Sequence, residues 1–372
     1  MNVHVLRNSF TLWLGAILGV VILILRSVVG LTPQYVEQFY ARGLFRAVRW
    51  LFDNSLSLIN MPLLLVFYVI MAVFVVKFII FLFSKKIPLR VRLIDALRKV
   101  LNFSGYMLFL FMLLWGFNYA RPRFTEQIGL KLEQLDTTAL HQELIIAAAE
   151  AAAARDELTK NPIPINENND SSTTVPSSVT MNNAFEINIR EDVSKYLKNN
   201  GFHADGHLRG RQIQPKGVLF RFGIAGIYMP FTGEASIDAG LHALEKPFSM
   251  AHEMAHGYGW TDEATANFIA YNTCINSNNK RIRYSGYLNY FKYVANNYRR
   301  INPKLYTIFR QSLPDGMRND IDAINKRILA YPMWFSTDKI NDVFLKSQGV
   351  TEGVESYAKI VVLVYSQRKN RY

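Results

Sequence analysis

The chain has 372 residues, of which half are hydrophobic, and a formal net charge of +13 at pH 7. This hydrophobic content is high for a soluble enzyme, and the single cysteine, Cys274, excludes an intrachain disulfide. No pattern of basic and aromatic residues typical of a nucleic-acid-binding module accompanies the charge, so we expect no nucleic-acid partner. We expect the basic residues to face anionic lipid headgroups instead.

Three apolar runs lie within the first third of the chain, at about residues 10–31, 61–83 and 100–117. About 20 apolar residues are enough for a helix to cross a bilayer, and the third run is the shortest of the three. No convincing signal-peptide cleavage site follows the first run, so we expect an uncleaved anchor. The runs predict three transmembrane helices in a membrane anchor over residues 1–118, followed by a separate domain over residues 119–372.

Basic residues between the second and third runs indicate the orientation of the chain in the membrane. Because cytoplasmic loops carry an excess of Lys and Arg, we expect this loop in the cytoplasm and the residues after Asn118 outside the cell membrane. Arg42, Arg46 and Arg49 in the first loop oppose this orientation, although their spacing suits a helix that lies in the membrane interface. The second loop has one acid, Asp95, and its basic residues are Lys85, Lys86, Arg90, Arg92, Arg98 and Lys99.

The domain after the third run is predicted to be mainly α with a small β element. An alanine-rich helix over 140–158 precedes a tract at about 160–183 whose Pro, Asn and Ser content indicates flexibility. Residues 217–238 are the best strand candidate, with a break at Pro230. Helical patterns predict further helices at 191–198, 247–257, 262–276, 284–299, 303–312, 317–329 and 354–367.

The strongest chemical signal is the segment HEMAHGYGWTDEATANF at residues 252–268. If a helix opens at the preceding proline, His252 and His256 project from one face, one turn apart, and can bind a single ion. Glu253 then lies beside the ion and suits the role of base for a metal-bound water. A catalytic zinc takes three protein ligands and keeps one open position, and Glu263 is the nearest residue that can supply the third ligand.

The residues around Glu263 support a second helix that returns to the ion. Gly257 and Gly259 allow a sharp turn, and Thr261 is a candidate N-cap. Asn267 lies four residues beyond Glu263 on the same helix face, where it can hydrogen-bond the outer nitrogen of a ligand histidine. The alternative is a helix whose histidines only satisfy local hydrogen bonds. A site inside the membrane is excluded because no twenty-residue apolar stretch surrounds the motif.

Three other features carry weaker signals. Tyr357 can donate a hydrogen bond to the oxyanion that develops on a peptide carbonyl, although core packing is the commoner role of such an aromatic residue. His242 can reach the pocket, but a surface or capping role is the commoner one. An edge strand within residues 217–238 can hold an extended substrate by main-chain hydrogen bonds, or it can simply cover the metal-binding helix, and we weigh the two equally.

At these motifs the chain resembles a family of bacterial membrane proteins, domain of unknown function family 3810. The resemblance covers most of the chain in order, from the N-terminal spans through WGFNYARP, GIAGIYMPFTGEAS and PFSMAHEMAHGYG to FLKSQGVTEGVESYAK. It implies a membrane-anchored zinc metallopeptidase of the gluzincin kind, with His252, His256 and Glu263 as ligands and Glu253 as general base. The usual family pattern has two acids two residues apart, whereas Glu263 is followed here by Thr265. Glu263 must then be the carboxylate ligand, and Asp262 is its only local competitor.

The expected fold is therefore mainly α: three N-terminal transmembrane helices and an extracytoplasmic α+β zincin-like domain whose small β element precedes the HExxH helix. The first functional hypothesis is a multi-pass protein of the bacterial inner membrane that hydrolyses peptides or envelope proteins with one zinc ion. The second is a non-catalytic membrane-tethered scaffold with a structural metal. A closed four-ligand site favours the scaffold, and an open position that faces Glu253 favours the enzyme.

Overall fold

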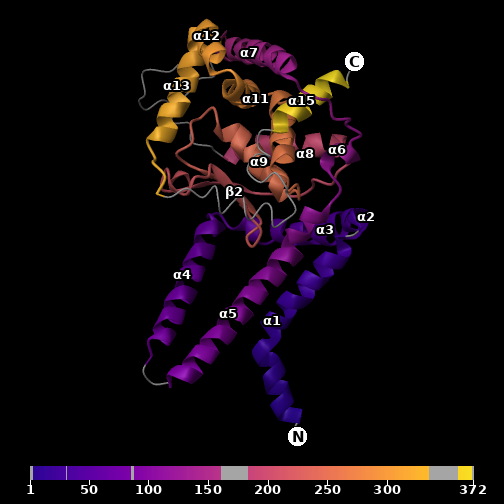
Figure 1. Cartoon of the computed structure of the whole chain (residues 1–372), viewed down its shortest axis with the longest axis vertical. Coiled ribbons are helices and arrows are strands. Elements are labelled where there is room, and N and C mark those ends of the chain that lie inside the picture. The colour runs from indigo at the N-terminus through magenta and orange to yellow at the C-terminus, as the bar shows by residue number, and fades with distance from the viewer. Residues whose placement is uncertain (1–2, 31, 85–87, 161–182, 335–358, 371–372) are drawn as a thin grey trace. The chain divides into compact units, whose positions relative to one another are not determined.

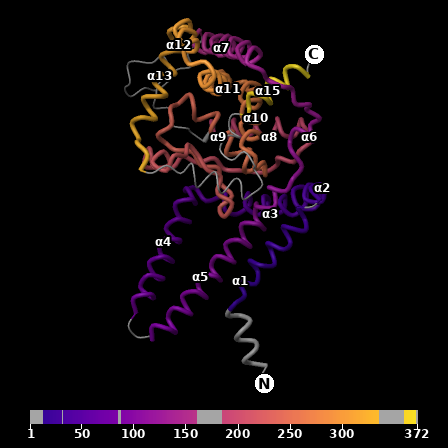
Figure 2. The backbone as a smooth tube through the Cα atoms, in the orientation of Figure 1, coloured from indigo at the N-terminus to yellow at the C-terminus, as the bar shows by residue number. Residues whose placement is uncertain are grey.

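The structure of the chain is a computed structural model that describes residues 3–30, 32–84, 88–160, 183–334 and 359–370 (Figure 1). The chain is mainly helical with one small sheet, as the sequence predicts. It divides into two compact units. Unit 1 consists of residues 1–122 and 229–233, and unit 2 of residues 123–228 and 234–372. Figure 2 traces the course of the backbone through both units.

Unit 1 contains the three long helices α1 (Val3–Val29), α4 (Leu63–Leu82) and α5 (Leu89–Leu114). Both α4 and α5 are long and apolar enough to cross a membrane. A third span is reached only if the segments Trp13–Val29 and Pro33–Leu58, which meet at a bend of 113°, form one span together. Two or three apolar helices therefore agree with the predicted membrane anchor by length and composition.

Between α1 and α4 the chain forms short helical pieces that separate apolar and polar side chains. They are α2 (Pro33–Tyr35), the π-helix η1 (Val36–Leu44), α3 (Phe45–Asp53) and the 3-10 turn η2 (Leu56–Leu58). One prediction for this segment is wrong, because the side chain of Arg49 is buried instead of exposed to lipid headgroups. It forms an ion pair with Asp53 and donates a hydrogen bond to the carbonyl of Gly233 at 2.8 Å.

The basic loop predicted between the second and third apolar runs is largely helical. Pro88 has an extended backbone, and α5 begins directly after it at Leu89. Arg90, Arg92, Arg98 and Lys99 therefore lie on the first turns of α5. The segment LRVRLIDALRKV continues the helix because Leu, Arg and Lys have high helix propensity even where the apolar run has not yet started. After Leu114 the chain tightens into the 3-10 turn η3 (Gly116–Ala120).

The helices of unit 2 correspond to the predicted ones with shifted ends, except the short α6, which was not predicted. The largest shift is at α8, which begins eight residues before the predicted start at 191. The predicted tract at about 160–183 lies almost entirely outside the described residues, and Tyr357 also lies outside them. The helices are α6 (Phe124–Gln127), α7 (Thr137–Lys160), α8 (Asn183–Asn199), α9 (Lys246–Gly257), α10 (Glu263–Ile275), α11 (Lys280–Ile301), α12 (Pro303–Ser312), α13 (Asp315–Leu329) and α15 (Ile360–Lys369).

The sheet of unit 2 has three short strands in the order β1-β3-β2. They are β1 (Gly210–Ile213), β2 (Gly226–Met229) and β3 (Glu234–Asp238). β1 pairs in parallel with β3, with Gly210 opposite Ala235. The predicted strand at 217–238 is thus two strands, preceded by the 3-10 turn η4 (Phe220–Phe222), with the expected break at Pro230. The prediction missed β1 because its four residues GRQI have neither the length nor the alternation of a strand signal.

The central strand β3 is buried along its whole length and packs against α9. α9 also contacts α10 and α11, and Figures 1 and 2 show these elements gathered in the middle of the unit. The first turn of α9 is held by α11, because the Phe248 N–H donates to Ser285 Oγ at 3.2 Å. The helix that carries the HExxH motif is therefore held on two sides, by the sheet and by a helix from later in the chain.

Candidate metal centre

The two histidines of the motif meet on α9 as their spacing predicts. α9 begins at Lys246 with Pro247 in its first turn, where the missing N–H of proline leaves no hydrogen bond unmade. The rings of His252 and His256 have their centroids 4.7 Å apart and lie nearly perpendicular. Their Nε2 atoms are 3.0 Å apart. Both rings thus point toward one position beside the helix.

A tight turn after α9 brings the next helix back to this position. Gly259 has a φ of 90°, in the left-handed region that favours glycine. Gly257 is needed for a different reason, because a Cβ there would lie 2.5 Å from the side chain of Leu208. The prediction of Thr261 as N-cap is wrong: the Asp262 side chain caps α10 and accepts a hydrogen bond from the Thr265 N–H at 2.7 Å. That bond occupies the carboxylate that was the local competitor for the metal.

Glu263 is the first residue of α10, and its carboxylate reaches both histidines. Its Oε2 lies 3.1 Å from His252 Nε2 and 3.5 Å from His256 Nε2. In a tetrahedral zinc site with bonds of 2.0–2.2 Å, neighbouring ligand atoms are about 3.3–3.6 Å apart. The three atoms form a triangle of nearly this size, so the residues fit a single zinc ion.

The hydrogen bonds behind the two rings orient their lone pairs toward the ion position. His256 Nδ1 lies 2.6 Å from the carbonyl oxygen of Trp260, which can only accept, so the hydrogen is on Nδ1 and the lone pair on Nε2. His252 Nδ1 donates in the same way to Asn267 Oδ1 at 2.8 Å. Asn267 Oδ1 also accepts from the Tyr293 hydroxyl at 3.1 Å. Such outer hydrogen bonds are the usual means of fixing the tautomer of a metal-binding histidine.

Two carboxylates and two imidazoles set the charge of this pocket. Burial lowers the pKa of His256, but the carboxylates of Glu263 and Glu253 outweigh it and raise that pKa to about 9. Burial raises the pKa of Glu263, but the two imidazoles outweigh it and hold the pKa well below its usual range. In the metal-free protein a proton on His256 therefore faces the Glu263 carboxylate, and a metal must displace this proton to bind.

Glu253 lies next to the three converging groups without being one of them. Its side chain is buried, and burial raises its pKa above the ordinary value although the neighbouring histidines act in the opposite sense. Strand β2 passes directly over it: the Tyr228 backbone N–H donates to the carboxylate, and a Cβ on Gly226 would lie 2.6 Å from Glu253 Oε1. Glycine is thus required at 226 for the strand to lie this close to the acid.

A pocket of about 460 Å³ opens beside these residues. Both His252 and Glu253 line it. Its other walls combine apolar side chains such as Phe248 with polar ones such as Lys292 and Tyr293. The volume lies within the range of small-ligand sites, which place a few polar groups among apolar walls. The metal position therefore has access to a cavity large enough for part of a substrate.

The structure thus brings together His252, Glu253, His256, Glu263 and Asn267. Tyr293, from α11, also belongs to this constellation, and burial raises the pKa of its phenol, which keeps it a hydrogen-bond donor. Tyr293 could not be predicted, since no local sequence pattern connects a residue of α11 with the motif. Tyr357 lies outside the described residues, so its proposed role stays a prediction.

The two other residues considered above lie in the core. His242 is buried instead of exposed at the surface, and its Nδ1 accepts from the Leu244 N–H at 3.3 Å just before α9. Of the surface or capping role expected for His242, this bond agrees with capping. Cys274 is fully buried, as expected of a small core residue.

Comparison with known proteins gives one match. The model of a family described as "Protein of unknown function (DUF3810)" matches residues 40–365. Neither the curated proteins nor the solved structures contain a match to the chain. The matched range includes α4, α5, the sheet and the whole HExxH region.

Metal affinity should depend on pH through His256. Because its pKa is raised to about 9 in the metal-free site, the apparent affinity for Zn²⁺ should fall about tenfold for each pH unit below 9. The same shift makes protonated His256 stabilise the metal-free fold below about pH 6.5, a contribution lost as the pH rises through about 9. Competition with a chromophoric chelator between pH 7 and 9 measures the slope. An affinity that does not change over this range would contradict the assignment.

Removing the partner of His252 should weaken the metal site without unfolding the domain. In Asn267→Ala the ring loses the acceptor that fixes its tautomer, and we expect zinc affinity to fall about 10- to 100-fold. Asn276→Ala is the matched control, because Asn276 lies at the other end of α10 and its side chain donates a hydrogen bond to the Asn272 carbonyl. Equal zinc affinity in the two variants, measured by chelator competition, would show that Asn267 does not support the ligand.

Proposed function

The chain belongs to the DUF3810 family of proteins of unknown function, and we propose that it is a membrane-anchored zinc metallopeptidase. One observation carries the proposal. The Oε2 atom of Glu263, on α10, lies 3.1 and 3.5 Å from the Nε2 atoms of His252 and His256, on α9. Two imidazoles and a carboxylate in this arrangement are the ligand set of a catalytic zinc site.

The number of converging groups favours an enzyme over a scaffold with a structural metal. A structural zinc is enclosed by four protein ligands, whereas a catalytic zinc has three and an open position. Among the described residues, His252, His256 and Glu263 form the one such cluster of possible ligands. The pocket of about 460 Å³ adjoins this cluster, so the fourth position is free for water and substrate.

Glu253 is the proposed general base. A zinc ion held by the three ligands would supply Lewis acidity and lower the pKa of a bound water. Glu253 would take the proton of the attacking water and deliver it to the leaving amine. Burial raises the pKa of this carboxyl, which brings it closer to neutral pH and so suits both halves of the transfer. The N–H of Tyr228 orients the carboxylate for this role.

Peptides are the substrates that best suit the walls of the pocket. Strand β2 is at an edge of the sheet, and the segment Gly223–Gly226 lines the pocket beside Glu253. An edge strand can bind an extended peptide by main-chain hydrogen bonds, with side-chain pockets that provide selectivity. The apolar surface around Ile224 and Phe248 would accept an apolar side chain of the substrate. Lys292, which pairs with Glu245, and Asn289 are polar groups of the same pocket.

We propose that the catalytic domain, residues 119–372, lies outside the inner membrane of a bacterial cell. The basic residues at the start of α5 favour a cytoplasmic position for that end of the helix. Of the arginines that oppose this orientation, Arg49 pairs with Asp53, and Arg42 shares the carboxylate of Glu37 with Arg121. Their weight as cytoplasmic markers is therefore smaller than the sequence alone indicates.

The decisive test compares the full-length wild-type protein with Glu253→Gln in mild detergent. Metal content and cleavage of casein or a peptide library are measured on the same samples. The variant should keep one zinc per chain and lose roughly 10²- to 10⁴-fold in turnover, the usual contribution of a general base. Glu157→Gln is the matched control, because Glu157 is an exposed partner of Arg283 away from the site.

Equal hydrolysis by wild type and Glu253→Gln would refute the assigned base. A wild-type protein without zinc, or zinc held by four protein ligands with no hydrolysis of any peptide, would refute the enzyme and leave a scaffold. X-ray absorption at the zinc edge counts the ligands and separates these outcomes.

A further inference from the structure

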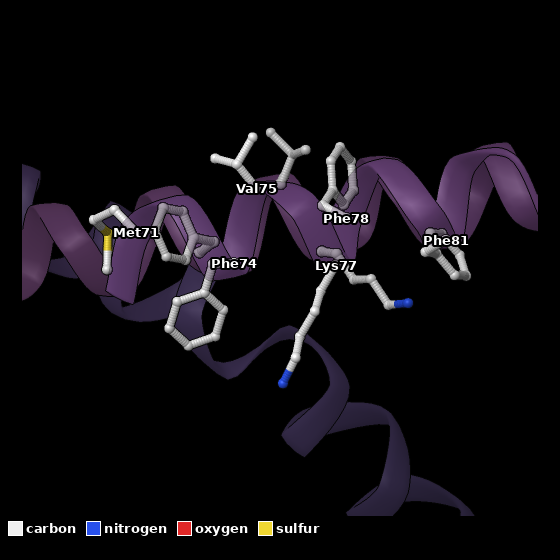
Figure 3. Close-up of a pocket in the computed structure, with 9 residues that line it drawn as sticks. Met71, Phe74, Val75, Lys77, Phe78 and Phe81 are labelled. Carbon is white, nitrogen blue, oxygen red and sulfur yellow. The ribbon is translucent and has the colours of Figure 1, made fainter. Parts of the chain in front are cut away.

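A groove of about 510 Å³ lies between α4 and α5 in unit 1. Figure 3 shows the residues of α4 that form one side of it, which follow one another along the helix. Its walls are apolar and rich in phenylalanine, with two lysines among them. The nine described lining residues are Met71, Phe74, Val75, Lys77, Phe78, Phe81, Lys99, Val100 and Phe103.

The two lysines are unusual because they are the charged residues in an otherwise apolar groove. Lys77 is the only charged residue within α4, whose other nineteen positions are apolar or aromatic. A charged side chain in such a helix is costly in hydrocarbon and usually marks a functional site. Lys99, on α5, holds its ammonium group 3.2 Å from the centre of the Phe81 ring. None of the nine lining residues is acidic, so the groove itself supplies no carboxylate for these two charges.

Both lysines lie at the level where the apolar segments meet the basic ones. Lys77 is five residues from the end of α4, or about 8 Å along the helix axis. Lys99 directly precedes the apolar stretch of α5, and Arg90 and Arg92 lie two to three turns further out. Phosphate groups of a bilayer lie at this boundary, and the hydrocarbon chains begin on its apolar side.

We propose that this groove binds an anionic phospholipid of the inner leaflet. The lipid phosphate lies between Lys77 and Lys99, and one acyl chain lies along Phe74, Phe78 and Phe103. Basic pockets between transmembrane helices select anionic headgroups, because each lysine contributes an attraction that a zwitterionic headgroup largely cancels. A single lysine near a helix end would simply extend to the interface, but two lysines from different helices at one aromatic groove form a binding site. The site depends on the proposed membrane insertion and not on the metal centre.

The experiment measures lipid binding to the full-length protein by native mass spectrometry in mild detergent. Phosphatidylglycerol and phosphatidylcholine with the same acyl chains are added in parallel to wild type, Lys77→Gln/Lys99→Gln and Arg90→Gln/Arg92→Gln. Wild type should retain one phosphatidylglycerol in preference to phosphatidylcholine. The lysine variant should bind phosphatidylglycerol about tenfold or more weakly. The arginine variant also loses two positive charges, both from α5 and both outside the groove, and it should bind phosphatidylglycerol like wild type.

Three results would overturn the site. Equal retention of phosphatidylglycerol by wild type and the lysine variant would show that the two lysines do not bind the lipid. Equal weakening in the arginine variant shows a diffuse effect of surface charge. A stable lipid-free dimer shows that a second copy covers the groove. Membrane fractionation of the same variants separates failure of the lipid site from failure of the anchor, because a protein without membrane insertion would appear in the soluble fraction whatever its lysines.

Discussion

Two imidazole lone pairs and a carboxylate meet in a buried pocket of this protein, and they can stay there only with a cation between them. The Nε2 atoms of His252 and His256 lie 3.0 Å apart, and Glu263 Oε2 is within 3.5 Å of both. Unpaired charge and facing lone pairs in a site of low dielectric cost several kcal/mol, which a proton or a metal removes. A proton can satisfy this requirement at neutral pH. A zinc ion would also satisfy it, and it would in addition supply a Lewis acid that lowers the pKa of a bound water.

The architecture of unit 2 serves to hold those atoms in place. The sheet and α11 support α9 from two sides, and the turn at Gly259 returns the chain to Glu263 within a few residues. The Trp260 carbonyl, which fixes His256, belongs to a residue whose ring packs edge-on against Phe124 and Phe202 with centroids 4.7 Å apart. Aromatic packing in the core thus fixes the position of a backbone acceptor, and that acceptor fixes a ligand tautomer.

The charges of unit 1 follow a different rule. Charges that have partners are buried in pairs, as in Arg49 with Asp53 and Arg121 with Glu37 at 2.7 Å. Lys77 and Lys99 are the contrasting case, because they lie on apolar helices beside aromatic rings. In a membrane the natural partner for such a pair is the lipid itself. Metal binding is thus our proposal for the buried charges of unit 2, and lipid recognition our proposal for these two exposed lysines of unit 1.

The sequence by itself determined what depends on local backbone geometry. The four-residue spacing of His252 and His256 places them on one helix face, and the four-residue spacing of Glu263 and Asn267 does the same one helix later. The apolar runs determined that two or three helices are able to cross a membrane. These features could be predicted because helical periodicity and turn chemistry act over a few residues.

Only the tertiary structure decided which side chains from distant segments meet. Tyr293 reaches Asn267 from another helix, β1 pairs with β3 across more than twenty residues, and Arg49 is buried by Asp53 instead of facing lipid. Asp262 caps α10 in place of Thr261 because the turn after α9 places residue 262, and not residue 261, at the helix end. Such contacts depend on how whole helices and strands pack against one another, and packing is set by the shape and volume of the entire core, which no local pattern encodes.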